Sequence, residues 1–309
     1  MRRYDYPLES MAAGSSRPAS LRVMFEALVM VGIWGANFSV VKAALAEVPP
    51  LAFNAFRFLL ASLLFYVVMR VRGPIPLPRR GDRARIVGLG IVGNVAYQLC
   101  FIYGVNGLRA GVSSLLLAGT PILTALLSAA RGQERPGVKV WAGATATVLG
   151  MSLVVEGLGE GIGQGEESLA GALLMVGASA AWSVYTVGSR DLIARYGPVA
   201  VTAWTLWVGA AGQFILGLRE VFAHQWVGTS VQAWVGIVYS GALAISVAYL
   251  LWSRAVQAIG SARAAIYNNL VPVLALVVAW LWLGEVPTGG QALGAGIIIA
   301  GVSLAQSRD

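Results

Sequence analysis

Aromatic and amide side chains recur at helical spacing inside the apolar runs of this sequence. One such run carries, at positions i, i+3, i+4 and i+7 of a helix, Asn94, Tyr97, Gln98 and Phe101. This single face would offer flat apolar walls together with hydrogen-bonding groups. A cavity that holds a small amphipathic solute needs both features. The pattern therefore favours reversible binding of a small molecule.

Four further runs carry residues of the same kind, and together they define the candidate substrate site. The candidate substrate-binding residues are Trp34, Asn37, Tyr97, Phe101, Trp182, Tyr185, Tyr249, Trp252, Tyr267, Asn268 and Asn269. The alternative for the aromatic residues is ordinary helix packing, and for the asparagines it is hydrogen bonding between neighbouring helices. Pro121 and Pro272 interrupt the hydrogen-bonding pattern of their runs, so both are candidate hinges for gating.

Arg57 is the one ionisable residue well inside an apolar run. A charge at that depth is costly and is usually functional or paired. The sequence places no acidic residue at matching depth. Arg57 could therefore contact a substrate carboxylate, or it could play a structural role by binding backbone carbonyls or reaching towards the membrane surface. Its counterpart in the internal repeat described below is Thr205, which favours the structural role.

Other kinds of chemistry have little support. The chain has one cysteine and one histidine, so it offers neither an intramolecular disulfide nor a pair of histidines for a metal. No cluster of His, Asp and Glu and no activated nucleophile lies inside the apolar runs. We therefore expect no enzymatic activity, no cofactor and no metal site. The net charge of +8 is spread between apolar runs and does not indicate a nucleic-acid partner.

The elements that would position these residues are membrane-spanning helices. The chain is 57% hydrophobic and only 12% charged, about half the charged fraction of a soluble domain. Its apolar runs are about 20 residues long, which suits helices that cross a bilayer, and they lack the alternation of barrel strands. The ten runs are 24–45, 50–69, 86–105, 110–130, 137–156, 168–189, 198–217, 232–253, 259–283 and 289–306.

The basic residues predict the orientation of these ten spans. Eighteen of the 22 lysines and arginines fall in the tail or in connections on one side, three fall on the other side, and Arg57 lies within a span. Cytoplasmic segments carry the excess of positive charge. Both termini are therefore expected in the cytoplasm of a multi-pass protein of the inner (plasma) membrane, with the lipid bilayer as its partner.

An internal repeat relates the two halves of the chain. Trp34 and Lys42 recur as Trp182 and Arg190, at an offset of 148 residues. The pairs at an offset of 151 residues are Pro121 with Pro272, Glu134 with Glu285, Pro136 with Pro287, Gly143 with Gly294, and Gly150 with Gly301. Each half then holds five spans. Because five is odd, the second half must cross the membrane in the opposite sense, which is an inverted repeat suited to alternating access.

The repeat determines the domain organisation that the sequence predicts. The chain is expected to consist of a disordered cytoplasmic tail (1–22), the first five-helix repeat (23–156), an external linker (157–167), the second five-helix repeat (168–306) and a C-terminal tail (307–309). We expect the chain to function as a monomer.

Several of these motifs resemble the EamA family of the drug/metabolite transporter superfamily. They are the W-G-x-N-F-x3-K pattern from Trp34 to Lys42, the Arg57-Phe58 pair, and the P-x12-E-x-P pattern that occurs in both halves. The resemblance covers nearly all of residues 24–306. It implies a ten-helix basket with a central cavity and export of small metabolites such as amino acids, with the aromatic amino acid exporters as similar proteins.

The sequence thus predicts an exporter of small amphipathic metabolites, amino acids in particular, that works by alternating access. One alternative is an obligate exchanger of anionic or phosphorylated metabolites, which would need two or more cationic groups in its cavity. A membrane-embedded enzyme or a lipid-linked carrier is the other alternative. The first would need clustered catalytic residues at depth, and the second would need a lateral opening.

Overall fold

The fold is known from a computed structural model that describes residues 21–71, 73, 77–131, 137–159, 168–259, 267 and 270–306. Every regular element in those ranges is a helix, which confirms the predicted all-α class. The predicted tail up to residue 20, most of the 157–167 linker and the last three residues lie outside the described part of the chain.

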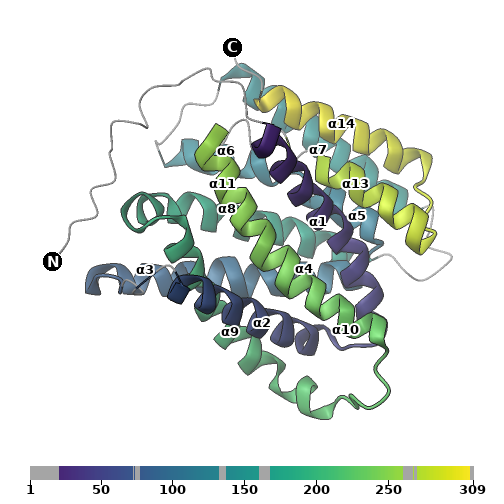
Figure 1. Cartoon of the computed structure of the whole chain (residues 1–309). Coiled ribbons are helices and arrows are strands. Elements are labelled where there is room, and N and C mark those ends of the chain that lie inside the picture. Colours follow the sequence, from purple (N-terminus) through teal and green to yellow (C-terminus); the bar gives the residue numbers. More distant parts are fainter. Residues whose placement is uncertain are drawn as a thin grey trace.

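The helices of the first half pack alongside those of the second half (Figure 1). The first half contains α1 (Leu21–Leu45), α2 (Pro50–Val71), α3 (Arg80–Gly90), η2 (Ile91–Ala96), α4 (Tyr97–Asn106), α5 (Ala110–Leu117), α6 (Thr120–Ala130) and α7 (Val138–Gly159). The second half contains α8 (Leu169–Tyr196), α9 (Pro198–Ala223), α10 (Val231–Val238), η3 (Tyr239–Val247), α11 (Ala248–Ile259), α13 (Leu270–Val278), η4 (Ala279–Leu283) and α14 (Gly289–Gln306).

Seven helical stretches are long and apolar enough to cross a bilayer. They are Leu21–Leu45, Pro50–Val71, Arg80–Asn106, Ala110–Leu127, Leu169–Tyr196, Pro198–Ala223 and Val231–Trp252. Shorter apolar helices cover Val138–Val154, Leu270–Leu283 and Gly289–Leu304. Each of the ten predicted runs therefore overlaps an apolar helix, although the run 259–283 does so only over Leu270–Leu283. Seven of them have full spanning length, and the total of ten crossings stays a prediction.

The structure is less regular than the predicted spans. The run 110–130 is broken after Leu117, and α6 begins at Thr120 with Pro121 in its first turn. Proline suits this position for two reasons. The N–H groups of a first turn have no partner within the helix, and the φ angle that the proline ring imposes is close to the helical value. Three other runs contain the π-helical segments η2, η3 and η4, which the sequence did not predict. Such segments are frequent at functional sites.

At one end of the bundle, glutamate carboxylates bind backbone N–H groups in the first turns of helices. We call this end the Glu285 end. This end contains the connections 45–50, 106–110, 223–231 and 283–289. Glu285 accepts hydrogen bonds from the backbone N–H groups of Ala110 and Gly111, at 2.9 and 3.1 Å. Glu220 of α9 likewise accepts from two N–H groups in the first turn of α2, at 2.7 and 3.1 Å. Both contacts join one half of the chain to the other, and both place negative charge at a helix N-terminus.

Glu47 makes a third contact of this kind and gives the molecule a testable pH dependence. Its carboxylate accepts from the Ser230 hydroxyl at 2.6 Å and from the Ser230 N–H at 2.8 Å. These bonds lower the pKa of Glu47 below its ordinary value of 4.5, the hydroxyl bond more than the backbone bond. A carboxylate with a lowered pKa in the folded state stabilises that state above pH 4.5, and the stabilisation is lost as the pH falls through the lowered pKa.

We therefore expect Glu47→Gln to lower the melting temperature at pH 7, and we expect this difference to vanish in acid well below pH 4.5. Thermal unfolding of both proteins across that range measures the difference. A gap that stays the same at every pH would contradict the role assigned to the Glu47 charge.

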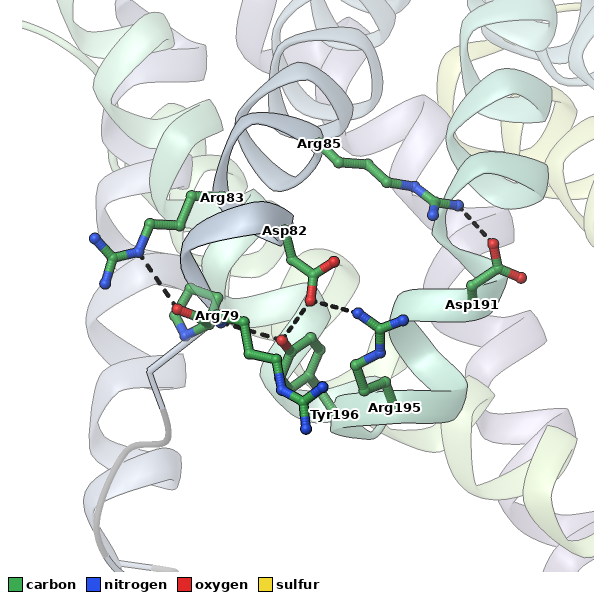
Figure 2. Close-up of polar contacts among 8 residues, drawn as sticks. Arg79, Asp82, Arg83, Arg85, Asp191, Arg195 and Tyr196 are labelled. Carbon is green, nitrogen blue, oxygen red and sulfur yellow. Dashed lines mark hydrogen bonds and ion pairs between the residues drawn. The ribbon is translucent and has the colours of Figure 1, made fainter.

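Ionic contacts join the two halves at the opposite end, as Figure 2 shows for α3 and α8. Asp82 accepts from Arg195 at 2.6 Å and from the Tyr196 hydroxyl at 2.5 Å. Arg85 pairs with Asp191 at 3.0 Å. Such exposed ion pairs contribute little to the stability of a fold, because water screens the charges.

Repeat-related helices also contact one another directly. The helices α7 and α14 approach closely at two glycine pairs. A Cβ atom placed on Gly150 would lie 2.8 Å from the Gly294 carbonyl oxygen, and one on Gly301 would lie 2.7 Å from the Gly143 carbonyl oxygen. Glycine allows such close backbone contact between helices in a membrane. In Figure 1, α14 runs alongside α7, while the related helices α2 and α9 pack together elsewhere in the bundle.

Candidate functional site

A network of aromatic rings lies where the two halves meet, and Trp182 of α8 is at its centre. The ring of Trp182 lies 5.0 Å from that of Tyr97, 5.2 Å from Tyr185 and 5.7 Å from Tyr249, measured between centroids. Tyr97 belongs to α4 and Tyr249 to α11, so three helices contribute rings to this contact. Distances of 4.5–7 Å are those at which aromatic pairs attract one another.

The network continues on both sides of this centre. Trp34 of α1 lies 6.0 Å from Tyr249 and 6.0 Å from Trp252. On the other side, Phe101 of α4 lies 6.0 Å from Tyr97. Seven of the candidate residues are therefore linked through successive ring contacts, and they come from two helices of each half. We call these seven the aromatic network; they are Trp34, Tyr97, Phe101, Trp182, Tyr185, Tyr249 and Trp252.

The aromatic network also bridges the two hydrophobic clusters of the interior. Trp34, Tyr97 and Trp252 pack against the cluster formed largely by α1, α4, α5 and α13. Trp182 and Tyr249 pack against the cluster formed largely by α2, α3, α8 and α9. The aromatic network is thus in contact with both clusters.

The remaining candidate residues have different surroundings. Asn37 is buried, and its side-chain oxygen has no hydrogen-bond partner among the described residues. Tyr267 is partly buried against the same cluster as Trp34. Pro272 is buried within α13. Asn268 and Asn269 lie outside the described residues, so their role in substrate binding stays a prediction.

Two serines near Trp182 contact helix α6. Ser179 and Ser183 share a helix face with Trp182 in the sequence pattern. In the structure their hydroxyls lie 3.1 Å from those of Thr120 and Thr124, respectively. These bonds join α8 to α6. The two serine hydroxyls are therefore already hydrogen-bonded within the protein and are not free to bind a substrate.

A buried polar network, which the sequence analysis missed in part, lies beside the aromatic network. Asn54 of α2 donates to the Gln98 carbonyl and to the Gln213 side chain, both at 3.3 Å. Gln213 of α9 donates in turn to the carbonyls of Asn94 and Val95, at 3.0 and 3.3 Å. These two carbonyls belong to η2. An amide in the middle of an apolar run was the available signal for Asn54 and Gln213.

Arg57 is the centre of this polar network. Its guanidinium donates to the Ser240 hydroxyl at 2.8 Å and to the side-chain oxygen of Gln98. Ser240 belongs to η3 and Gln98 to the first turn of α4, directly after η2, so Arg57 is held between the two halves of the chain. Arg57 is only 1% exposed. Its neighbours in this network are neutral, and their arrangement can bind a polar group but offers no acid or base for catalysis.

The described residues contain no group of three or more His, Cys, Asp or Glu side chains that could hold a metal ion. A small cavity of about 10 Å³ lies at the Glu285 end, where it is lined by Arg109, Glu285 and Gln291 among others. Its volume suits a single water molecule. This cavity is therefore too small to hold a metabolite.

Comparison with known proteins agrees with this architecture. The model of the EamA-like transporter family matches residues 21–156 and 169–306. The "Uncharacterized transporter YdfC" of Bacillus subtilis is 31% identical over 291 residues, which cover 93% of this chain and 91% of that protein. A "Probable terminal-alkyne amino-acid exporter" of Streptantibioticus cattleyicolor is 28% identical, with 93% and 94% of the two chains covered.

A solved crystal structure has the same fold, with a TM-score of 0.66 at 20% sequence identity, covering 92% of this chain and 96% of the other. The family model covers both halves of the chain. The long apolar helices of the chain are those of a multi-pass membrane protein. The resemblance inferred from the motifs is thus confirmed. This chain belongs to the EamA-like transporter family.

Proposed function

We propose that this protein exports small amphipathic metabolites, amino acids in particular, across the inner (plasma) membrane by alternating access. The observation that carries the proposal is the aromatic network, which draws rings from two helices of each half and lies next to buried amides. Such a surface binds an amphipathic solute without making it react. Because its members come from both halves, movement of one half against the other would open the site to either side in turn.

The contacts between the halves support an inverted repeat of two five-helix units with ten crossings and both termini in the cytoplasm. Gly150 contacts Gly294 and Gly143 contacts Gly301, although the repeat relates Gly143 to Gly294 and Gly150 to Gly301. A two-fold axis produces this reciprocal pairing. The ring contacts follow the same rule, since Trp34 contacts α11 while its counterpart Trp182 contacts α4.

The amino-acid substrate class is supported by a relative. The Streptantibioticus cattleyicolor protein is named an amino-acid exporter, and it matches this chain along nearly its whole length. An exchanger of phosphorylated metabolites has less support, because it would need several buried cationic groups. Arg57 is the single buried lysine or arginine among the residues that the structure describes.

Counterflow in proteoliposomes tests the proposed function. Vesicles loaded with an unlabelled solute should accumulate the same labelled solute from outside, with separate assays for amino acids, nucleosides and phosphate esters. We expect accumulation of amphipathic amino acids and none of phosphate esters. Accumulation of phosphate esters alone would favour the exchanger, and the absence of any uptake would contradict the carrier function.

A further inference from the structure

The charge of Arg57 is not compensated by any anion in the described part of the structure. Two of its nitrogens donate to neutral oxygens, those of Ser240 and Gln98, and its Nε has no hydrogen-bond partner. The ion pairs of Arg22, Arg85, Arg195 and Arg254 lie at the end of the bundle opposite the Glu285 end. A buried cation without a counter-charge is strongly unfavourable. An anion that entered this site would remove that penalty, which favours a site that is filled during the transport cycle.

The chemistry around Arg57 would suit a carboxylate. Its fork of N–H groups matches the two oxygens of a carboxylate, and such charge-assisted bonds are about twice as strong as those to neutral acceptors. The Gln98 and Ser240 oxygens occupy two of these N–H groups at present. A carboxylate that displaced either oxygen would make a stronger bond with the same donor.

Arg57 is also placed so that the rest of an amphipathic acid could reach the aromatic network. The central carbon of its guanidinium lies 5.3 Å from the Phe53 ring centroid and 5.6 Å from that of Phe101. Phe101 is itself a member of the aromatic network through its contact with Tyr97. A charged end and a continuous apolar surface are therefore adjacent, which is the pattern of an acid with an aromatic or aliphatic side chain.

The position of Arg57 between the halves would couple this site to movement. Arg57 and Gln98 belong to the first half, while Ser240 belongs to the second. The backbones are in close contact here, since a Cβ atom on Gly241 would lie 2.7 Å from the Arg57 carbonyl oxygen. Separation of the halves would remove the Ser240 hydroxyl from the guanidinium. The freed N–H group would then be available to a substrate.

We propose that Arg57, together with Gln98 and Ser240, forms the subsite that binds the carboxylate of the transported solute. This inference rests on the proposed function and narrows it to small amphipathic acids, including amino acids. Arg57 is then a specificity-determining residue, and a solute with the same side chain but a neutral amide in place of the carboxylate is a poor substrate.

Matched acid and amide pairs test this inference in the reconstituted full-length protein. The probes are L-phenylalanine with L-phenylalaninamide, and L-leucine with L-leucinamide, in counterflow at equal concentrations. Wild-type protein should transport the acids at least tenfold faster than the amides. Arg57→Gln should slow the acids at least tenfold and leave the amides unchanged, whereas Arg57→Lys should keep part of the preference because it keeps the charge.

Thr147→Val is the matched control, since Thr147 is a buried hydroxyl in α7 and should leave the acid preference as in the wild type. Melting temperatures of all variants separate a folding defect from a change in specificity. Equal wild-type rates for acid and amide would overturn the inference while leaving the carrier function intact. So would a folded Arg57→Gln protein with the wild-type preference, because that result would show a purely structural role. A wild-type protein that transported neither class would overturn the proposed function itself.

Discussion

Trp182→Ala will reduce counterflow of an amphipathic amino acid at least tenfold in protein that remains folded. Trp182 contacts Tyr97, Tyr185 and Tyr249, so its removal breaks the aromatic network at its centre. A solute that stacks on Trp182 would lose a contact of the kind that contributes about 0.5–1.5 kcal/mol per aromatic pair. A loss of about 1.4 kcal/mol in binding corresponds to a tenfold change, and an equal amount of wild-type protein in proteoliposomes provides the reference.

Trp141→Ala is the control for this experiment, because Trp141 has a side chain of the same type but is 57% exposed on α7. Transport by this variant should equal that of the wild type. If Trp182→Ala lowered the melting temperature but transported at the wild-type rate, the aromatic network would be packing alone.

Gly294→Ala will destabilise the protein by about 1–3 kcal/mol, the usual cost of overfilling a packed interface. A Cβ atom at this position would lie 2.6 Å from the Gly150 carbonyl oxygen and 2.8 Å from Cγ2 of Val154. The carbonyl belongs to a helix backbone and cannot rotate away as a flexible side chain could. Thermal unfolding in detergent should show a melting temperature several degrees below that of the wild type.

Gly296→Ala on the same helix provides the matched control. Nothing lies within 4 Å of a Cβ atom at Gly296. Alanine has the higher helix propensity by about 1 kcal/mol, so this variant should be as stable as the wild type or slightly more stable. Equal destabilisation by both substitutions would contradict the close contact between α7 and α14.

Helical spacing alone was enough to predict much of the candidate site. Tyr97 and Phe101 were placed on one helix face by their separation in the sequence, and the structure links both to Trp182. Contacts between distant segments were a different matter. Ser183 directly follows Trp182 in the sequence, yet its hydroxyl is bonded to α6, because packing between helices decides which neighbour a short side chain meets.

Other features had weaker signals or none. The amides of Asn54 and Gln213 stand in apolar runs and could have been noticed. Their partners could not, since Asn54 donates to the Gln98 carbonyl in α4 and Gln213 donates to carbonyls in the π-helical segment η2. Ser240 resembles any other small residue in a membrane helix. The break at Gly119 and Pro121 was visible as a proline, yet the sequence did not show that the helix ends and restarts there.

The most direct test of the account is the accessibility of the site from each side of the membrane. A thiol introduced by Trp252→Cys would lie within the aromatic network, against Trp34, in a background where Cys100→Ser removes the native cysteine. A membrane-impermeant maleimide should react with it in right-side-out and in inside-out vesicles, and a transported amino acid should slow both reactions. Reaction from one side only, with no protection by any transported solute, would contradict alternating access at the aromatic network.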